Sequence, residues 1–299
     1  MSHLYTELAR LQSLKIEKQD LALESVKKAL KYNPNNNYAL NLLKQFEGKS
    51  FRKETETIEK EYIDEVFAAL NDPTKFVIVQ DAPAVRAALG EEFGMEPGTR
   101  VTGKMVTALR NLGFDFVFDT DFAADLTIME EGTELLTRLG KFLKGDKDAN
   151  IPILTSCCPG WVNFFEHNFP ELKHIPSTAK SPQQMFGALA KTFYAKKRNI
   201  DPSKIVSVSI MPCTAKKFEA DRPEMRSSGF KDVDYVLTTR ELGRMLKQDG
   251  IDFNFLPEDS CGSPLGEWAG AAGIFGASGG VMEPALRTVY EVVTGETLQ

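Results

Sequence analysis

The sequence has few of the residues that mark a disulfide scaffold or a zinc site. Its 299 residues include only 4 cysteines and 3 histidines. Small secreted domains stabilised by disulfides are much richer in cysteine, and no histidine here stands at zinc-like spacing from a cysteine pair. We therefore expect a reducing, cytoplasmic compartment and a metal or catalytic role for the thiols. His3, His167 and His174 are interpreted as surface or partly buried side chains, not ligands.

An excess of positive charge and long hydrophobic runs are also missing. The net charge is −6, which argues against nucleic acid as a partner because phosphate binding requires a basic face. No stretch approaches the roughly 20 apolar residues that a membrane helix needs, so we expect no membrane span. The N-terminus has neither the basic region nor the apolar core of a secretory signal. Composition otherwise fits a globular protein, with 42% hydrophobic and 26% charged residues.

Residues 1–60 differ from the rest and contain no cysteine. Their leucines recur near helical spacing, and the run Asn33–Asn37 interrupts the pattern. Residues 29–40 resemble part of a tetratricopeptide helix pair, although one copy cannot bury its faces by stacking. We predict a helical N-terminal extension, with a docking module for a partner as the alternative.

From residue 61 onward, apolar strand-like runs alternate with helical patterns. Strands are expected over 76–79, 116–118, 151–154, 205–210 and 235–237. This alternation predicts an α/β fold in which helices cover parallel sheet, with functional residues at the carboxyl ends of strands. Thr102, Ser181 and Thr238 are predicted to cap helices, Ser181 with Pro182 in the first turn and Thr238 with Glu241 in a capping box.

Two cysteine motifs each follow such an apolar run. The segment 155–161 places Cys157 beside Cys158, and the segment 211–217 contains Cys213. Adjacent cysteines can hardly bridge each other, so two separate roles are expected. A thiolate can ligate a soft metal, and a second thiol can donate or accept a proton. The two motifs are predicted to lie on strand-to-helix turns that converge on one cluster.

The segment around Cys261 and the glycine-rich stretch that follows it also need an interpretation. Cys261 lies in a turn-rich stretch and is interpreted as a loop thiol, with a ligand or sensor as the alternative. The glycine-rich stretch 270–280 lacks the Lys-Ser/Thr of a phosphate-binding loop. Its glycines favour a close approach of the backbone to a cluster or to a neighbouring helix.

Together these motifs resemble the iron-only ([FeFe]) hydrogenases, in the order of that family, from about Glu61 to the last residue. The two cysteine segments resemble the first two of three family signatures. Further similar segments are 81–86, 102–105, 119–125, 129–131, 180–184, 264–267 and 275–283. The third signature, with two further cluster cysteines, is expected beyond Glu283, and the sequence reaches Gln299 without it.

The resemblance implies a fold of two lobes of parallel sheet flanked by helices, with the active site in the cleft between them. Residues 61–156 are expected to form the first lobe. Residues 157–299 are expected to form the second lobe, C-terminally incomplete, and residues 1–60 the short helical extension.

The resemblance also implies the cofactor, the H-cluster. This is a [4Fe–4S] cubane joined to a di-iron subcluster that bears CO, CN and a bridging dithiolate amine. Cys158 and Cys213 would be cubane ligands, and Lys216 would donate hydrogen bonds to a cyanide. The family's pocket residues are expected at Ala82, Pro83, Gln183, Met211 and Phe275.

For proton transfer, the resemblance assigns Cys157 as the group next to the di-iron unit. It assigns Glu131, Glu134 and Ser177 as the relay toward solvent. Judged by the residues alone, the two glutamates fit a solvated helix face and Ser177 a turn or cap.

The function implied is hydrogenase activity in anaerobic hydrogen metabolism: reversible conversion of protons and electrons to dihydrogen. Electrons would come from ferredoxin or an electron-transfer subunit, and hydrogenase maturation proteins would build the di-iron part. The alternative is a truncated or split, sensory or iron–sulfur-assembly relative without autonomous catalysis. A separate chain with Cys-x-x-x-Cys would then supply the missing cysteines.

Overall fold

The computed structural model describes residues 19–32, 34, 60–262 and 269–296. The chain divides into two compact units, residues 1–60 and 61–299. In the first unit the structure describes helix α2 (Gln19–Tyr32), in agreement with the helical periodicity. The rest of the predicted extension, including most of the Asn33–Asn37 interruption, lies outside the described residues.

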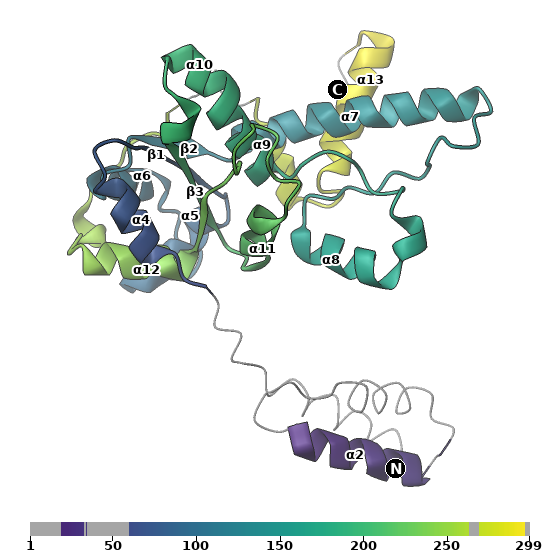
Figure 1. Ribbon diagram of the computed structural model, residues 1–299, viewed down its shortest axis with the longest axis horizontal. Coiled ribbons are helices and arrows are strands. Elements are labelled where there is room, and N and C mark those ends of the chain that lie inside the picture. The colour runs from purple at the N-terminus through teal and green to yellow at the C-terminus, as the bar shows by residue number, and fades with distance from the viewer. Residues whose placement is uncertain (1–18, 33, 35–59, 263–268, 297–299) are drawn as a thin grey trace. The chain divides into compact units, whose positions relative to one another are not determined.

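A four-stranded parallel sheet lies toward one end of the unit 61–299 (Figure 1). Its strands are β1 (Phe76–Asp81), β2 (Phe116–Asp119), β3 (Ile205–Met211) and β4 (Tyr235–Thr238), in the order β2-β1-β3-β4. In the inner strand β1, Val79 lies opposite Val117 of β2 on one side and Val208 of β3 on the other. The predicted α/β class is confirmed, and so are four of the five predicted strands.

Both faces of the sheet are buried, and side chains alternate between them along each strand. Val77 and Val79 belong to one hydrophobic core, which includes side chains of the helices at residues 63–70, 102–111 and 239–248. Ile78 belongs to a second core on the opposite face, where Phe118 contacts Phe186. Helices therefore cover both faces, as the continuous apolar character of the strands predicts.

The α-helices of this unit are α4 (Ile63–Leu70), α5 (Val85–Ala88), α6 (Thr102–Asn111), α7 (Asp121–Leu143), α8 (Pro159–Asn168), α9 (Pro182–Leu189), α10 (Ala195–Arg198), α11 (Ala215–Asp221), α12 (Thr239–Gln248) and α13 (Met282–Thr294). Short 3-10 turns are η2 (Leu89–Phe93), η3 (Pro170–Leu172), η5 (Pro202–Lys204), η6 (Phe253–Phe255) and η7 (Ala271–Gly276), and η4 (Ala190–Tyr194) is a π-helical turn.

Two of the three predicted helix caps are confirmed. The Ser181 side chain accepts a hydrogen bond from the Gln184 amide, and Thr238 and Glu241 form a capping box. The prediction for Thr102 is wrong, because Thr102 is the first residue of α6. Val101 holds the cap position, without a side-chain cap bond.

The strand predicted over 151–154 is also wrong. Leu154 forms a single bridge with Pro176, while Ile151 and Pro152 are exposed. Proline lacks the N–H that a sheet interior requires, and no neighbouring strand runs beside this segment in the described part of the chain. All the described strands belong to one sheet, so the second sheet of the two-lobe prediction is not among them.

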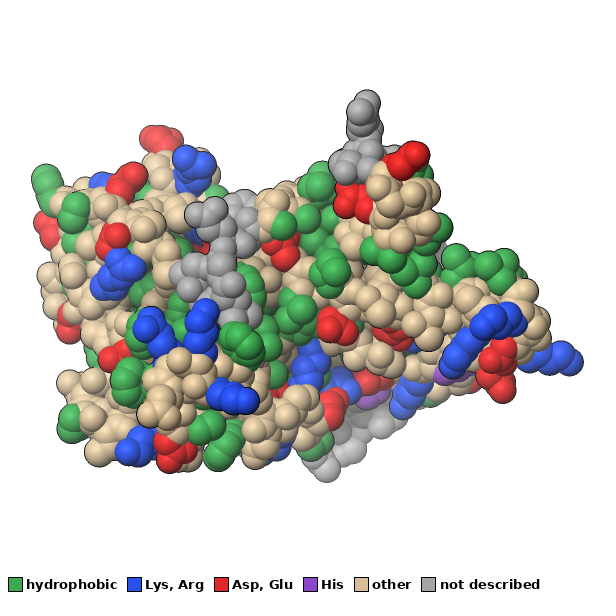
Figure 2. All heavy atoms as spheres, turned by 90° about the horizontal axis from the view of Figure 1, so that it is seen from above, with side chains coloured by type: hydrophobic (Ala, Val, Ile, Leu, Met, Phe, Trp, Pro, Cys, Tyr) green, Lys and Arg blue, Asp and Glu red, His purple; other side chains and the backbone are tan. Residues whose placement is uncertain are grey.

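Helices α7 and α13 lie side by side, to one side of the sheet (Figure 1). Hydrophobic side chains gather on the surface over these helices (Figure 2). Their exposed members are Met129, Leu139, Phe142, Leu143, Met282, Leu286, Tyr290, Val292 and Val293. Within the described residues, every helix is too short or too polar to cross a bilayer.

Candidate active site around the cysteine turns

The Cys157–Cys158 pair forms the turn that starts helix α8. Cys158 is the N-cap residue, with extended backbone angles (φ −95°, ψ 108°), and Pro159 occupies the first turn. Cys157 is half-buried, Cys158 is exposed, and all four cysteines of the chain are free thiols. The exposed thiol of Cys158 is thus available as a ligand, while Cys157 is more enclosed.

The Cys213 turn lies at the carboxyl edge of the sheet. It follows Met211, the last residue of β3, and precedes α11. This is the position that parallel α/β topology favours for functional residues, and the sequence predicted it. Cys213 is half-buried.

Lys216 joins the two cysteine turns. From the first turn of α11, its Nζ donates to the backbone oxygen of Cys157 at 2.8 Å and lies 3.1 Å from Oε2 of Glu219. The same carboxylate oxygen accepts hydrogen bonds from Oγ of Ser181 (2.9 Å) and Nε2 of Gln183 (3.0 Å). The two turns are therefore neighbours in a buried polar network that includes the start of α9.

The network continues from Gln183 into the sheet. Ser209 on β3 donates to Oε1 of Gln183 at 2.7 Å, and Gln80 on β1 donates to the Gln183 backbone oxygen at 3.0 Å. Gln183 is thus fixed on several sides, which suits a pocket residue. Sequence reasoning missed Glu219, Gln80 and Ser209. The only local signal was the i, i+3 spacing of Lys216 and Glu219.

The predicted relay residues come together between α7 and the loop that precedes α9. Ser177 Oγ donates to Oε2 of Glu134 at 2.7 Å. Glu131, one turn earlier on α7, is 4% exposed, and its Oε2 has no hydrogen-bond partner. The interpretation of Glu131 as part of a solvated helix face is therefore wrong. Glu134 is partly buried and Ser177 is buried.

The environment separates the proton affinities of the two glutamates. Burial raises the pKa of Glu131, although hydrogen bonds from the Ser156 backbone and the Ser177 side chain act against it. Burial also acts on Glu134, but hydrogen bonds from Ser177 and Arg138 prevail and lower its pKa. Burial raises the pKa of the Cys157 thiol, with Lys216 acting in the opposite direction and Glu131 reinforcing the rise. Because of this difference, a proton is bound more readily at Glu131 than at Glu134.

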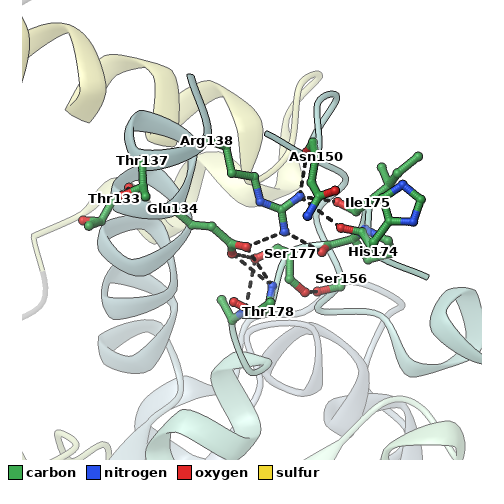
Figure 3. Close-up of polar contacts among 12 residues, drawn as sticks. Thr133, Glu134, Thr137, Arg138, Asn150, Ser156, His174, Ile175, Ser177 and Thr178 are labelled. Carbon is green, nitrogen blue, oxygen red and sulfur yellow. Dashed lines mark hydrogen bonds and ion pairs between the residues drawn. The ribbon is translucent and has the colours of Figure 1, made fainter. Parts of the chain in front are cut away.

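Arg138 holds the outer end of this group of predicted relay residues (Figure 3). Its guanidinium pairs with Glu134 one turn away on α7. It also donates to the backbone oxygens of Asn150 (2.9 Å), Ile175 (2.7 Å) and Pro176 (2.9 Å). One side chain thereby ties the segment before α8 and the loop after it to α7. The i, i+4 spacing of Glu134 and Arg138 was the only local signal for this pair.

The other predicted pocket residues lie at the ends of strands β1 and β3 and in η7. Ala82 follows β1 and its amide donates to Ile210 O at 3.0 Å, so buried Ala82 and Met211 lie at the ends of neighbouring strands. Pro83 is exposed. Phe275 is half-buried in η7, which packs against α7 and α13. The segment 264–267, which resembles the family, lies outside the described residues.

A cavity of about 230 Å³ lies beside the cysteine pair. Its lining comes from α8, the loop 176–181 and the end of α11, and includes Ser156, Pro159, Ser177, Glu219 and Arg222. Ser177 and Glu219, whose carboxylate pairs with Lys216, therefore both border it.

A second charged cluster lies at the carboxyl ends of β1 and β2. Arg86 pairs with Asp81 (2.9 Å), with Asp119 and with Asp121 (3.4 Å). Burial raises the pKa of Asp81 to about 7 against the attraction of Arg86, and burial with Asp119 raises the pKa of Asp121 to about 6. Cys261 Sγ lies 3.9 Å from Oδ1 of Asp81. Burial raises the pKa of the Cys261 thiol to about 12. This placement favours the loop-thiol interpretation of Cys261.

The Asp81 carboxyl is expected to make stability fall as pH rises. Its pKa is 3.8 in the reference state and about 7 in the fold, so the folded chain holds more protons between these values. Asp81→Asn should reduce the loss of unfolding free energy between about pH 5 and pH 7 by on the order of 1–2 kcal/mol. Urea titrations of both proteins across this range test it. Parallel pH profiles would contradict it.

The thiols suit part of an iron–sulfur site. Thiolates are the ligands of such clusters, and Cys158 and Cys213 stand on turns that Lys216 links. Within the described residues, no three Cys, His, Asp or Glu side chains gather as a ready metal site. Since a cubane takes four thiolates, these two cysteines fit half of its ligand set.

Comparison with known proteins decides the family. The family model "Iron only hydrogenase large subunit, C-terminal domain" matches residues 75–299. The chain belongs to the iron-only hydrogenase family. It is similar to the NADP-reducing hydrogenase subunit HndD of Solidesulfovibrio fructosivorans, with 64% identity over 81% of this chain and 41% of that protein. The periplasmic [Fe] hydrogenase large subunit of Nitratidesulfovibrio vulgaris is 52% identical over 79% of this chain and 55% of its own length.

Solved hydrogenase structures share the fold. Apo [FeFe]-hydrogenase HydA1 from Chlamydomonas reinhardtii, in a cysteine-to-histidine variant, superposes with a TM-score of 0.70 at 46% identity, over 80% of this chain and 60% of that one. Cytosolic iron–sulfur assembly component 3 of Bos taurus is also similar, at 34% identity over 76% of this chain and 48% of that protein. The matched residues cover 41% of HndD and 55% of the Nitratidesulfovibrio large subunit, so the chain spans about half the length of such relatives.

Proposed function

We propose that this hydrogenase-family domain interconverts protons and electrons with dihydrogen. The observation that carries the proposal is the group of proton-bearing side chains formed by Cys157, Glu131, Ser177 and Glu134. Cys157 lies within electrostatic reach of Glu131, and Ser177 hydrogen-bonds Glu134 on the next turn of α7. Proton reduction needs such a supply in a site otherwise closed to water. The higher identity to hydrogenases than to the assembly component supports this choice over the assembly alternative.

The cofactor proposed is the H-cluster, with Cys158 and Cys213 as two of its thiolate ligands. When bound, this group supplies the electron transfer and the di-iron centre at which protons and dihydrogen interconvert. Lys216 would point its remaining ammonium proton toward it, since its other contacts are the Cys157 backbone and Glu219. Ala82, Pro83, Gln183, Met211 and Phe275 are proposed as pocket residues.

In the proposed relay, Ser177 passes protons between Glu134 and Glu131. Ser177 Oγ has a single proton, so it can donate to Glu134 or to Glu131 but not to both at once. A proton passes along α7 when Ser177 Oγ gives its proton to the Glu131 carboxylate and takes one from a protonated Glu134, after which the hydroxyl turns back to Glu134. Burial keeps the Glu131 pKa high, which suits a group that holds the proton before it reaches Cys157 Sγ. The low pKa of Glu134 suits a group that equilibrates with solvent.

The partners are also proposals. Ferredoxin or an electron-transfer subunit would deliver electrons, and hydrogenase maturation proteins would insert the di-iron part. Two further cluster thiolates would come from a segment or separate chain with Cys-x-x-x-Cys. A cytoplasmic location stays a prediction, and one similar protein is named as periplasmic.

Anaerobic co-expression tests the proposal. The 299-residue chain is produced with the maturation proteins, with and without a C-terminal partner segment that carries Cys-x-x-x-Cys. Hydrogen evolution from reduced methyl viologen is then measured by gas chromatography. We expect activity with the partner segment only, because Cys158 and Cys213 supply two of the four cubane thiolates. Cluster binding without hydrogen evolution would instead favour the assembly-type or sensory alternative.

A further inference from the structure

Each cysteine turn is attached to a short helix, and the two helices pack together. Cys158 is the N-cap of α8, and Cys213 stands two residues before α11. Helices α8 and α11 are in contact (Figure 1). Any shift of α8 along or around α11 therefore changes the separation of Cys158 and Cys213.

The far ends of the two helices are joined by a bidentate ion pair. Arg222, the C-cap residue of α11, donates from Nη2 to Oε1 of Glu166 at 2.8 Å and from Nη1 to Oε2 at 3.1 Å. Glu166 lies in the last turn of α8. Two parallel bonds between planar groups restrict both distance and angle, which a single bond does not.

The pair lies where packing between the two helices is incomplete. The cavity of about 230 Å³ borders α8 and the end of α11, and both Glu166 and Arg222 line it. Side chains therefore do not fill the whole space between the helices. The links through Arg138 hold the neighbouring loops to α7, not to α11. At the near end, Lys216 holds the Cys157 backbone by a single hydrogen bond, which by itself does not set the direction of α8.

We infer that Arg222 and Glu166 are positioning residues, which fix α8 on α11 and so set the separation of Cys158 and Cys213. The inference rests on the proposed function in that these two thiols serve one cluster. The side chains are 21% and 35% exposed, so the pair contributes little to overall stability. Loss of the pair should instead change the distance between the Cys158 and Cys213 thiols.

Distance measurement in the cluster-free 299-residue chain tests this inference. Cys157→Ala and Cys261→Ser leave Cys158 and Cys213 as the only thiols for nitroxide labels, and dipolar broadening in the EPR spectrum reports their separation. In Glu166→Gln, we expect the population of spin pairs outside the parent distance peak to rise roughly two- to fivefold. This corresponds to loss of about 0.5–1 kcal/mol of coupling.

Glu224→Gln is the matched control. Glu224 also pairs with Arg222, but it lies two residues along the same segment and does not reach α8. That variant should keep the parent distances, and the exchange Glu166→Arg with Arg222→Glu should restore them. Urea midpoints near the parent value confirm that each variant is folded.

Two results would overturn the inference: parent-like distances in folded Glu166→Gln, or equal broadening in Glu224→Gln. Neither depends on hydrogen evolution. The proposed function could therefore fail while the distance result holds, and the reverse is equally possible.

Discussion

Cys157→Ala should lower hydrogen evolution by about 10²–10⁴-fold in the matured protein, the usual cost of losing one proton-transfer group. The iron content should stay at the parent level, because Cys158 and Cys213 are the proposed ligands. The fold around the turn should also survive, since Lys216 donates to the backbone oxygen of Cys157 and not to its thiol. Gas chromatography for activity and iron analysis on the same preparation measure both quantities.

Cys261→Ala serves as the control for loss of a thiol. Cys261 is half-buried like Cys157, but its neighbour is Asp81 in the Arg86 cluster and not the relay. Its removal should change hydrogen evolution little. Near-parent turnover in Cys157→Ala, or an equal loss in Cys261→Ala, would rule out the assigned proton role of Cys157.

Local signals in the sequence predicted most of the fold. The apolar run at residues 205–210 became β3, and there β1 and β4 supply the partners that a strand needs. Thr238 and Glu241 formed the predicted capping box, which depends only on residues near each other in the chain. The strand at 151–154 failed for a non-local reason: strands need a partner, and Leu154 meets only Pro176. The position of the Cys213 turn followed from topology alone.

The site was less accessible to such reasoning. The residues alone favoured a solvated face for Glu131, yet tertiary packing leaves it 4% exposed. Only the family resemblance selected Glu131, Glu134 and Ser177 for a relay. Arg138 and Glu219 were missed because their partners are backbone carbonyls and side chains brought close by loops, which no periodicity encodes.

Arg138→Met should lower the free energy of unfolding by about 3 kcal/mol. The guanidinium is 10% exposed and supplies charged hydrogen bonds to Glu134 and to the Asn150, Ile175 and Pro176 carbonyls. Methionine fills much of the volume but leaves a partly buried carboxylate and these carbonyls without their donor. Urea unfolding measures the loss.

Arg244→Met is the matched control, because Arg244 pairs with Glu61 at 2.7 Å while about half exposed. Such a pair contributes only about 0–1 kcal/mol. Amide hydrogen exchange adds a local measure: the Thr178 amide donates to Glu134, so it should exchange faster in Arg138→Met and at the parent rate in Arg244→Met. Arg138→Lys should fall between, since an ammonium keeps the charge but cannot span Glu134 and three carbonyls at once. Equal destabilisation by Arg138→Met and Arg244→Met would show that Arg138 does not hold the loop 176–181 to α7.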